Sequence, residues 1–343
     1  MKLRISYLAQ VLCLSSVLTL PVLATQQDPE ATTSIEHKAL VTSSHYMATA
    51  ANPLAVEAGR QVLAKGGSAV DAAIAMQLML GLVEPQSSGI GGGLFMLHFD
   101  AANKQLTSID GRETAPQQAG PDLFRVNGKL LPWREAFVGG KSVGVPGVVK
   151  SLELAYQLHG KLPWASLFDA AIKTAEQGFV VSPRLAGLLA SGWNPGLTGF
   201  APTKAYFQPT GQWLQAGQTL KNPAYAALLR RIAKEGSAAF YQGDNAKAIV
   251  NTVQQASVNP GKLTEQDLLA YQPVQRDAIC IPYRLYKVCS MAPPSSGGLA
   301  VLQILGLLAA TPVDKLKPNS VDAVHLISQA AKLAFADRER FAG

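Results

Sequence analysis

The sequence has 343 residues, of which 48% are hydrophobic and 15% charged, so it predicts a packed globular protein and excludes extensive disorder. The formal net charge is +7, but the basic residues are scattered, and Arg230-Arg231 is the only pair of adjacent arginines. Because nucleic-acid-binding surfaces cluster their basic residues, we expect no nucleic acid among the partners.

The first 24 residues predict an export signal. A basic start is followed by a largely apolar run over residues 5–20 and by a small-residue cleavage site at Val22-Leu23-Ala24. A membrane anchor is the alternative, but polar residues interrupt this run and it is short for a bilayer span. We therefore expect a signal peptide over residues 1–24 and a mature region over residues 25–343 that is periplasmic or secreted, without membrane attachment.

Two helices are predicted next in chain order. Asn52-Pro53 is a typical helix start, and Gly66-Gly67 is a typical stop. A second helix begins after Ser68, with Asp71 three residues on as an Asp variant of the capping box. Its body, residues 69–83, is apolar nearly all round, which predicts that the helix is buried.

A glycine-rich run and one arginine mark the next segment. Ser87–Gly93 contains four glycines, alternation predicts strands over Leu94–Asp100 and Gln105–Asp110, and Arg112 follows within Asp110–Pro116. A crowded backbone turn followed by a fixed guanidinium is typical of a small-carboxylate site, so Arg112 is a candidate substrate-binding residue. From the residues alone, a salt bridge at the strand end is the commoner role for Arg112, and close packing of layers explains the glycines equally well.

Other common site motifs are not indicated. The glycine run follows a helix and precedes a strand, the reverse of a dinucleotide-binding turn. The five histidines never occur at metal-ligand spacing, and no serine lies in a Gly-x-Ser-x-Gly elbow. Ser295-Ser296 precedes an apolar helix and could cap it or touch an anion there, the cap being the safer interpretation. We predict no catalytic residue, metal or cofactor in this chain.

The remaining elements are mostly helical and indicate an α/β or α+β fold of helices on a strand layer, without a clear domain boundary. Spacing and glycine stops predict helices near residues 147–159, 163–177, 222–235 and 245–256, then a short helix capped by Thr264–Asp267, an apolar helix to about Ala310, and a last helix from about Ser320. That last helix is still running at Arg340, so we expect a truncated chain.

Cys280 and Cys289 flank a predicted hairpin that turns at Arg284-Leu285. In that register the two cysteines face each other directly. The third cysteine of the sequence, Cys13, lies in the predicted signal peptide and is removed with it. A disulfide is expected in an oxidising compartment, with two free buried thiols as the alternative.

Several of these segments, in order, resemble the γ-glutamyltransferase (glutathione hydrolase) family. The resemblance is carried over almost the whole mature chain by Met47–Ala50, Gly66–Ala73, Pro85–Gly93 with Phe95-Met96, Asp110–Pro116, Val145–Gly147, Pro293–Gly298 and Phe335–Arg338.

The resemblance implies an α+β fold, the αββα sandwich of the N-terminal-nucleophile hydrolases, with two central antiparallel sheets covered by helices. The family's precursor cuts itself into a large and a small subunit. The new N-terminal Thr is then the nucleophile and its amine the base. By the same resemblance, Arg112 holds the substrate α-carboxylate.

The Thr-Thr-His or Thr-Ser-His motif that opens the family's small subunit is not found in this sequence. The chain therefore resembles most of a large subunit, incomplete at its C-terminus and inactive alone. The resemblance implies glutathione and γ-glutamyl compounds as substrates, amino acids or peptides as acceptors, and its own small subunit as partner.

Two alternatives stay open. One is a related amide acylase acting on a β-lactam side chain or on poly-γ-glutamate, and the other is a non-catalytic γ-glutamyl-binding fragment.

Overall fold

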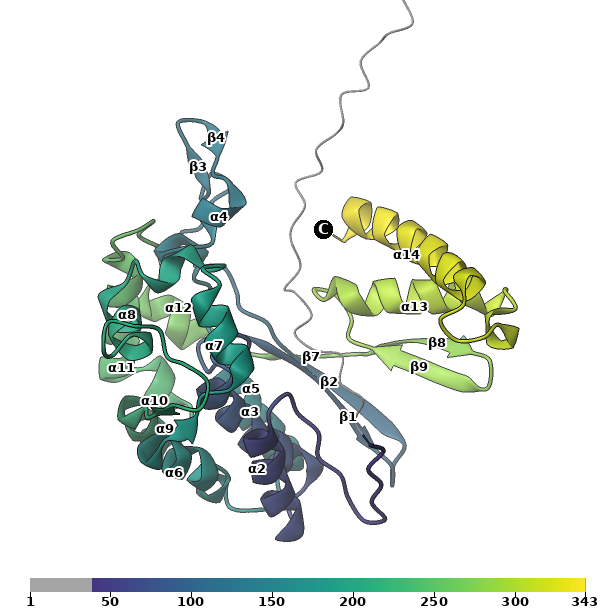
Figure 1. Cartoon of the computed structure of the whole chain (residues 1–343), viewed down its shortest axis with the longest axis horizontal. Coiled ribbons are helices and arrows are strands. Elements are labelled where there is room, and N and C mark those ends of the chain that lie inside the picture. The colour runs from purple at the N-terminus through teal and green to yellow at the C-terminus, as the bar shows by residue number, and fades with distance from the viewer. Residues whose placement is uncertain (1–38, 343) are drawn as a thin grey trace, which may run out of the picture. The chain divides into compact units, whose positions relative to one another are not determined.

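The computed structural model describes residues 39–342, so the predicted signal over residues 1–24 lies outside the described residues. The chain divides into two units, Met1–Thr42 and Ser43–Gly343. Residues 39–42 of the first unit are exposed and belong to no helix or strand. All elements described below belong to the second unit (Figure 1).

Helices make up most of the second unit, and its strands are short. The helices are α2 (Pro53–Ala64), α3 (Ala69–Val83), α4 (Trp133–Ala136), α5 (Val148–His159), α6 (Asp169–Gln177), α7 (Pro183–Ala190), α8 (Ala201–Phe207), α9 (Pro223–Glu235), α10 (Ala238–Tyr241), α11 (Gly243–Gln254), α12 (Glu265–Ala270), α13 (Ser296–Ala309) and α14 (Val321–Phe341). The strands are β1 (Leu94–Asp100), β2 (Gln105–Gly111), β3 (Arg125–Val126), β4 (Lys129–Leu130), β5 (Phe179–Val180), β6 (Thr219–Leu220), β7 (Val274–Arg276), β8 (Ile279–Tyr283) and β9 (Tyr286–Ser290).

The first two helices begin and end where their capping residues predict. The side chain of Asn52 caps α2, and Ser68 forms a reciprocal capping box with Asp71 at the start of α3. The Asp71 carboxylate is fully buried and also accepts a hydrogen bond from the backbone N–H of Lys161. The Asp71 side chain therefore caps α3 and also links this helix to the segment that follows α5.

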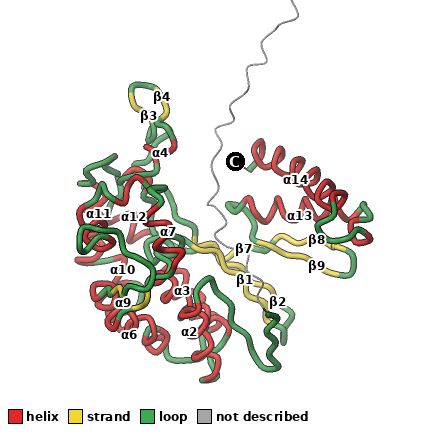
Figure 2. Tube along the Cα trace, in the orientation of Figure 1, coloured by secondary structure: helices red, strands yellow, loops and turns green. Residues whose placement is uncertain are grey.

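The three-stranded sheet has the order β1-β2-β7 and is antiparallel throughout. β1 and β2 pair from Leu94 opposite Gly111 to Asp100 opposite Gln105, as the predicted hairpin requires. β7 was not predicted, because three exposed residues carry no alternation to detect. Figure 2 shows these strands in yellow. α5 packs on β2.

The buried core lies among α2, α3, α5, α6 and α9. α3 is buried along most of its length, as its nearly continuous apolar sequence predicts. β1 is less buried than α3. Phe95, Leu97 and Phe99 lie on its exposed face, and the side chain of Phe99 is 60% exposed. The sheet therefore presents apolar side chains on the face opposite to the one that packs in the core.

Two predicted helix boundaries need correction. The expected helix over residues 163–177 is a 3-10 turn (Trp164–Leu167) followed by α6. The indole N–H of Trp164 donates to the carbonyl of Ile232 in α9, which fixes this turn apart from α6. The helix expected over residues 245–256 begins two residues earlier and ends at Gln254.

The C-terminal part contains the predicted cysteine hairpin, β8–β9, followed by α13 and α14. Its register is the predicted one, with Cys280 opposite Cys289 and the turn at Arg284-Leu285. The structure joins the two cysteines by a disulfide with Cα atoms 4.1 Å apart. α13 packs on both strands of the hairpin and on α14.

Candidate functional site

Three chain segments meet at the candidate site: the glycine run, the end of β2 with the residues after it, and the start of α5. The backbone N–H groups of Gly147 and Val148 donate to the carbonyl of Gly92 over 2.8 and 3.1 Å. The N–H of Val145 donates to the carbonyl of Thr114 over 2.8 Å, closing an isolated antiparallel bridge. These bonds hold Arg112 between a glycine turn and a helix start.

Glycine is required where these segments touch. A Cβ atom on Gly147 would lie 2.1 Å from the carbonyl oxygen of Gly111, and one on Gly93 would lie 2.8 Å from the same backbone oxygen. Both distances are far below any real carbon contact, so no larger residue fits without moving the backbone. The packing role that the sequence left open for the glycine run is therefore present in the structure.

The backbone of Arg112 is held on both sides of its Cα atom. Its N–H donates to Oδ1 of Asp110 over 3.0 Å, and its carbonyl accepts from the hydroxyl of Tyr271 over 2.9 Å. Its guanidinium is different: the side chain is 58% exposed, and Nε lies 3.7 Å from Oε2 of Glu113. An exposed pair at that distance is weak, so the guanidinium retains capacity to bind an anion.

Asp110 is the buried anchor of this arrangement. Its side chain is 7% exposed, and Oδ2 accepts from Nε of Arg276 over 2.7 Å. Arg276 lies on β7, where its carbonyl also accepts from the hydroxyl of Ser108 over 2.6 Å. The ion pair therefore fixes β7 beside β2 and turns the other carboxylate oxygen of Asp110 toward Arg112.

Tyr271 is buried and directed at the site by its neighbours. Its ring lies parallel to that of Tyr241, with centroids 6.1 Å apart, and its carbonyl accepts from Nζ of Lys150 over 2.6 Å. Burial raises the pKa of Tyr271 to about 12; a hydrogen bond with Ser151 acts in the opposite direction, and the negative charges of Asp110 and Glu113 add to the rise. The hydroxyl is therefore protonated at neutral pH and acts as a donor.

The helix cap predicted for Ser295-Ser296 does not form at Ser295. Ser295 precedes α13 but makes no side-chain capping hydrogen bond. The hydroxyl of Ser296 instead accepts from Nε of Arg338 on α14 over 2.9 Å. Sequence reasoning missed this pairing because the two residues are 42 positions apart.

Two of the described histidines lie against each other. His98 on β1 and His159 at the end of α5 stack with ring centroids 3.9 Å apart. Among the residues that the structure describes, no group of three or more His, Cys, Asp or Glu side chains is arranged to hold a metal ion.

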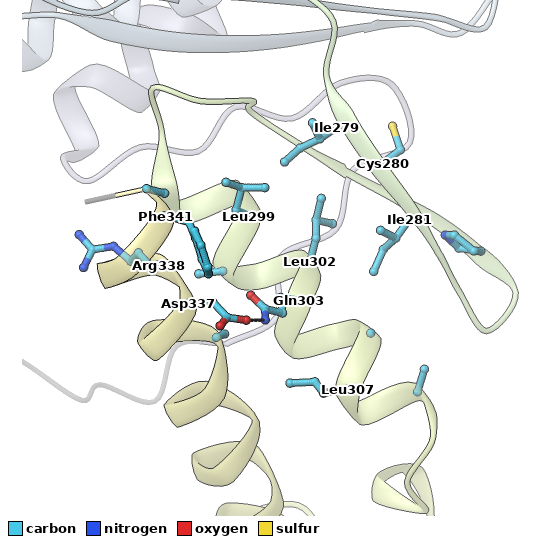
Figure 3. Close-up of a pocket in the computed structure, with 16 residues that line it drawn as sticks. Ile279, Cys280, Ile281, Leu299, Leu302, Gln303, Leu307, Asp337, Arg338 and Phe341 are labelled. Atoms are coloured by element: carbon cyan, nitrogen blue, oxygen red, sulfur yellow. Dashed lines mark hydrogen bonds between the residues drawn. The ribbon is translucent and has the colours of Figure 1, made fainter.

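A second feature is an apolar groove of about 710 Å³ between the cysteine hairpin and the last two helices (Figure 3). Figure 3 shows Ile279 and Ile281 of β8 with Leu299 and Leu302 of α13 along it. The amide of Gln303 donates to the carboxylate of Asp337 and links α13 to α14. The groove contains few charged groups, so it is suited to packing against apolar side chains rather than to chemistry.

Comparison with known proteins decides the family. The model of the gamma-glutamyltranspeptidase family matches residues 55–343 of this chain. The chain belongs to the γ-glutamyltranspeptidase family. It is 38% identical over 309 residues to the glutathione hydrolase proenzyme of Bacillus subtilis (strain 168), covering 90% of this chain and 52% of that protein. It is also 38% identical to the acylase ACY 1 proenzyme of Pseudomonas sp. (strain V22), covering 87% of this chain and 53% of that protein.

The structure agrees with this assignment. The γ-glutamyltranspeptidase of Helicobacter pylori superposes with a TM-score of 0.84 at 32% identity, covering 89% of this chain and 86% of the solved chain. The predicted α+β fold of the N-terminal-nucleophile hydrolases is thereby confirmed. The chain spans about half the length of the curated γ-glutamyltranspeptidase relatives it matches. Across residues 39–342, no helix has the length and apolarity that a bilayer crossing requires.

Proposed function

We propose that the protein to which this chain belongs transfers or hydrolyses γ-glutamyl groups, with glutathione and related γ-glutamyl amides as donors. The observation that carries this proposal is the Arg112 site within a chain of the γ-glutamyltranspeptidase family. Amino acids or peptides are the proposed acceptors, and water is the acceptor in hydrolysis.

Arg112 is the proposed residue for the donor's α-carboxylate. Its backbone is fixed by Asp110 and Tyr271, while its guanidinium is largely exposed and only weakly paired. A planar guanidinium matches a carboxylate through two parallel hydrogen bonds, which gives direction as well as charge.

The nucleophile that we propose is a Thr on a second segment, exposed as a new N-terminus by self-cleavage. Relatives of this chain are named proenzymes, and it spans about half of their length. It nevertheless covers 86% of the solved Helicobacter pylori chain, which supports a division of the relatives into two chains.

In the proposed reaction, the Thr hydroxyl oxygen attacks the carbonyl carbon of the γ-amide while the free α-amine takes the hydroxyl proton. The C–N bond breaks, the leaving amine takes that proton, and a γ-glutamyl ester of the Thr remains. Water or an acceptor amine then attacks the ester carbonyl, releases the γ-glutamyl product and returns a proton to the Thr oxygen. Arg112 holds the donor through both steps.

The second segment is also the proposed cover for the apolar surfaces of this chain. Phe95, Leu97 and Phe99 of β1 are exposed, and the groove in Figure 3 is lined mainly by aliphatic side chains. Contiguous exposed apolar surface marks an interaction site. We expect the 343-residue chain expressed alone to be inactive and to aggregate, and a soluble monomer with a cooperative melting transition would contradict this.

An exported protein is the proposed context. Residues 1–24 have the composition of a signal peptide, and the Cys280–Cys289 disulfide suits an oxidising compartment. N-terminal sequencing of the mature protein should begin at Thr25, and a chain that retains Met1 would contradict export by cleavage.

The decisive experiment is intact-mass analysis and N-terminal sequencing of the native gene product, followed by an assay with a γ-glutamyl anilide. A second polypeptide that begins with Thr, together with anilide release, supports the proposal. A single chain that ends at Gly343 and releases no anilide removes it.

An amide acylase is the second candidate, and the 38% identity to the acylase ACY 1 proenzyme favours it. A glutaryl anilide, which lacks the α-amine, separates the two. Turnover of the glutaryl but not the γ-glutamyl amide would favour the acylase. For a non-catalytic γ-glutamyl-binding protein, calorimetric titration with glutamate would show binding without turnover.

A further inference from the structure

The backbone carbonyl of Arg112 is held by one side chain from a distant part of the sequence. The hydroxyl of Tyr271 donates to this carbonyl over 2.9 Å, across a separation of 159 positions. Because the Arg112 guanidinium is largely exposed, its direction depends on the backbone from which it projects. On the N–H side the constraint comes from Asp110, two residues away, and on the carbonyl side it comes from Tyr271.

The surroundings of Tyr271 hold its ring and backbone in place beside Arg112. Its ring lies within 3° of parallel to the ring of Tyr241, and Nζ of Lys150 holds its carbonyl. A Cβ atom on Gly147 would lie 2.3 Å from the Tyr271 hydroxyl oxygen, so the glycine at that position leaves the space that the hydroxyl occupies.

Protonation keeps this hydroxyl a donor. The pKa of Tyr271 is raised to about 12, first by burial, so the phenol stays neutral throughout the neutral pH range. A carbonyl can only accept, so this polarity matches the contact with Arg112.

We propose that Tyr271 is a positioning residue for substrate binding: its hydroxyl fixes the Arg112 backbone so that the guanidinium meets the donor's α-carboxylate. This rests on the proposed γ-glutamyl function. Tyr271 does not itself touch the substrate, and its effect passes entirely through Arg112.

The test is Tyr271→Phe in the complete, processed protein, because this change removes one hydroxyl and keeps the buried ring. The expected result is a rise of about fivefold in KM for a γ-glutamyl anilide, the size of one hydrogen bond, with kcat within about twofold of wild type. The inhibition constant of free L-glutamate should rise by the same factor, because glutamate carries the same α-carboxylate.

Tyr225→Phe is the matched control. Tyr225 is also largely buried and donates to a backbone carbonyl, that of Leu78, over 2.9 Å, but it lies on α9 within the helix layer. The control should lose a comparable amount of thermal stability while KM and the glutamate inhibition constant stay at wild-type values.

The outcomes separate the two proposals. If wild type releases no anilide, the γ-glutamyl function fails. If wild type is active and Tyr271→Phe leaves KM and the glutamate inhibition constant unchanged, or lowers only kcat, the positioning role is overturned. If Tyr271→Phe does not fold, calorimetric titration of glutamate into Tyr271→His, whose shorter ring also cannot reach the carbonyl, takes its place, and unchanged affinity overturns the role.

Discussion

Nε of Arg276 donates to Oδ2 of Asp110 over 2.7 Å, although 166 positions separate the two residues. This one ion pair connects β7 to β2 and orients the carboxylate that holds the N–H of Arg112. The direction of the exposed Arg112 guanidinium therefore depends on the Asp110–Arg276 ion pair, in which the Asp110 carboxylate is buried.

Arg276→Gln tests the energetic role of this ion pair. The change removes the charged partner of the buried Asp110 carboxylate, and we expect the free energy of unfolding to fall by about 1–2 kcal/mol. Arg230→Gln is the control, because the Arg230–Glu176 pair is exposed on both sides and should contribute less to the free energy of unfolding. Denaturant unfolding of the complete protein measures both, and equal losses would show that burial of Asp110 adds nothing.

Arg112→Lys tests the binding role of the guanidinium. Lysine keeps the charge but loses the planar pair of donors, so we expect KM for a γ-glutamyl anilide to rise by at least about tenfold. Steady-state kinetics measure this, with Arg125→Lys as the control, since Arg125 is an exposed arginine paired with Asp122 on a surface turn. Wild-type KM in Arg112→Lys would contradict carboxylate recognition by this residue.

The half-buried histidine on β1, His98, gives the folding stability a pH dependence. The pKa of His98 is lowered, first by burial and then by the neighbouring His159, while Asp100 acts in the opposite direction. In the unfolded chain its pKa is about 6.5, so below that pH the unfolded state binds more protons than the folded state. We expect the free energy of unfolding to decrease as the pH falls below about 6.5, until the lower folded-state pKa is passed.

His98→Gln removes this titration and should flatten that part of the stability profile, measured by denaturant unfolding from pH 7 downward. His325→Gln is the control, because His325 is exposed on α14. The prediction is wrong if His98→Gln retains the wild-type slope.

The Cys280–Cys289 disulfide should stabilise the C-terminal hairpin. It closes a loop with a sequence separation of 9, for which restriction of the unfolded chain contributes about 2–3 kcal/mol. We expect a reductant to lower Tm of the complete protein, and the double variant Cys280→Ala/Cys289→Ala to have the lower Tm without responding to reductant. An equal response of wild type and variant to the reductant would point to a different cause.

Local sequence alone predicted much of the secondary structure. The caps at Asn52 and Ser68 are confirmed because a cap and the N–H groups it satisfies lie within three residues of each other. The hairpin register that places Cys280 opposite Cys289 is confirmed for the same reason, since a short turn fixes the pairing of its two strands. Arg112 was also found from its position after a strand, and its binding role stays a prediction.

Only the tertiary structure decided what surrounds Arg112. Asp110 pairs with Arg276, and Tyr271 bonds Arg112, across more than 150 positions, and no period or spacing in the sequence encodes such contacts. Ser296 likewise pairs with Arg338 of another helix, while the local cap predicted at Ser295 does not form. Propensity and capping act over a few residues, whereas these side chains meet because the pairing of β7 with β2, and the packing of α13 against α14, bring distant segments together.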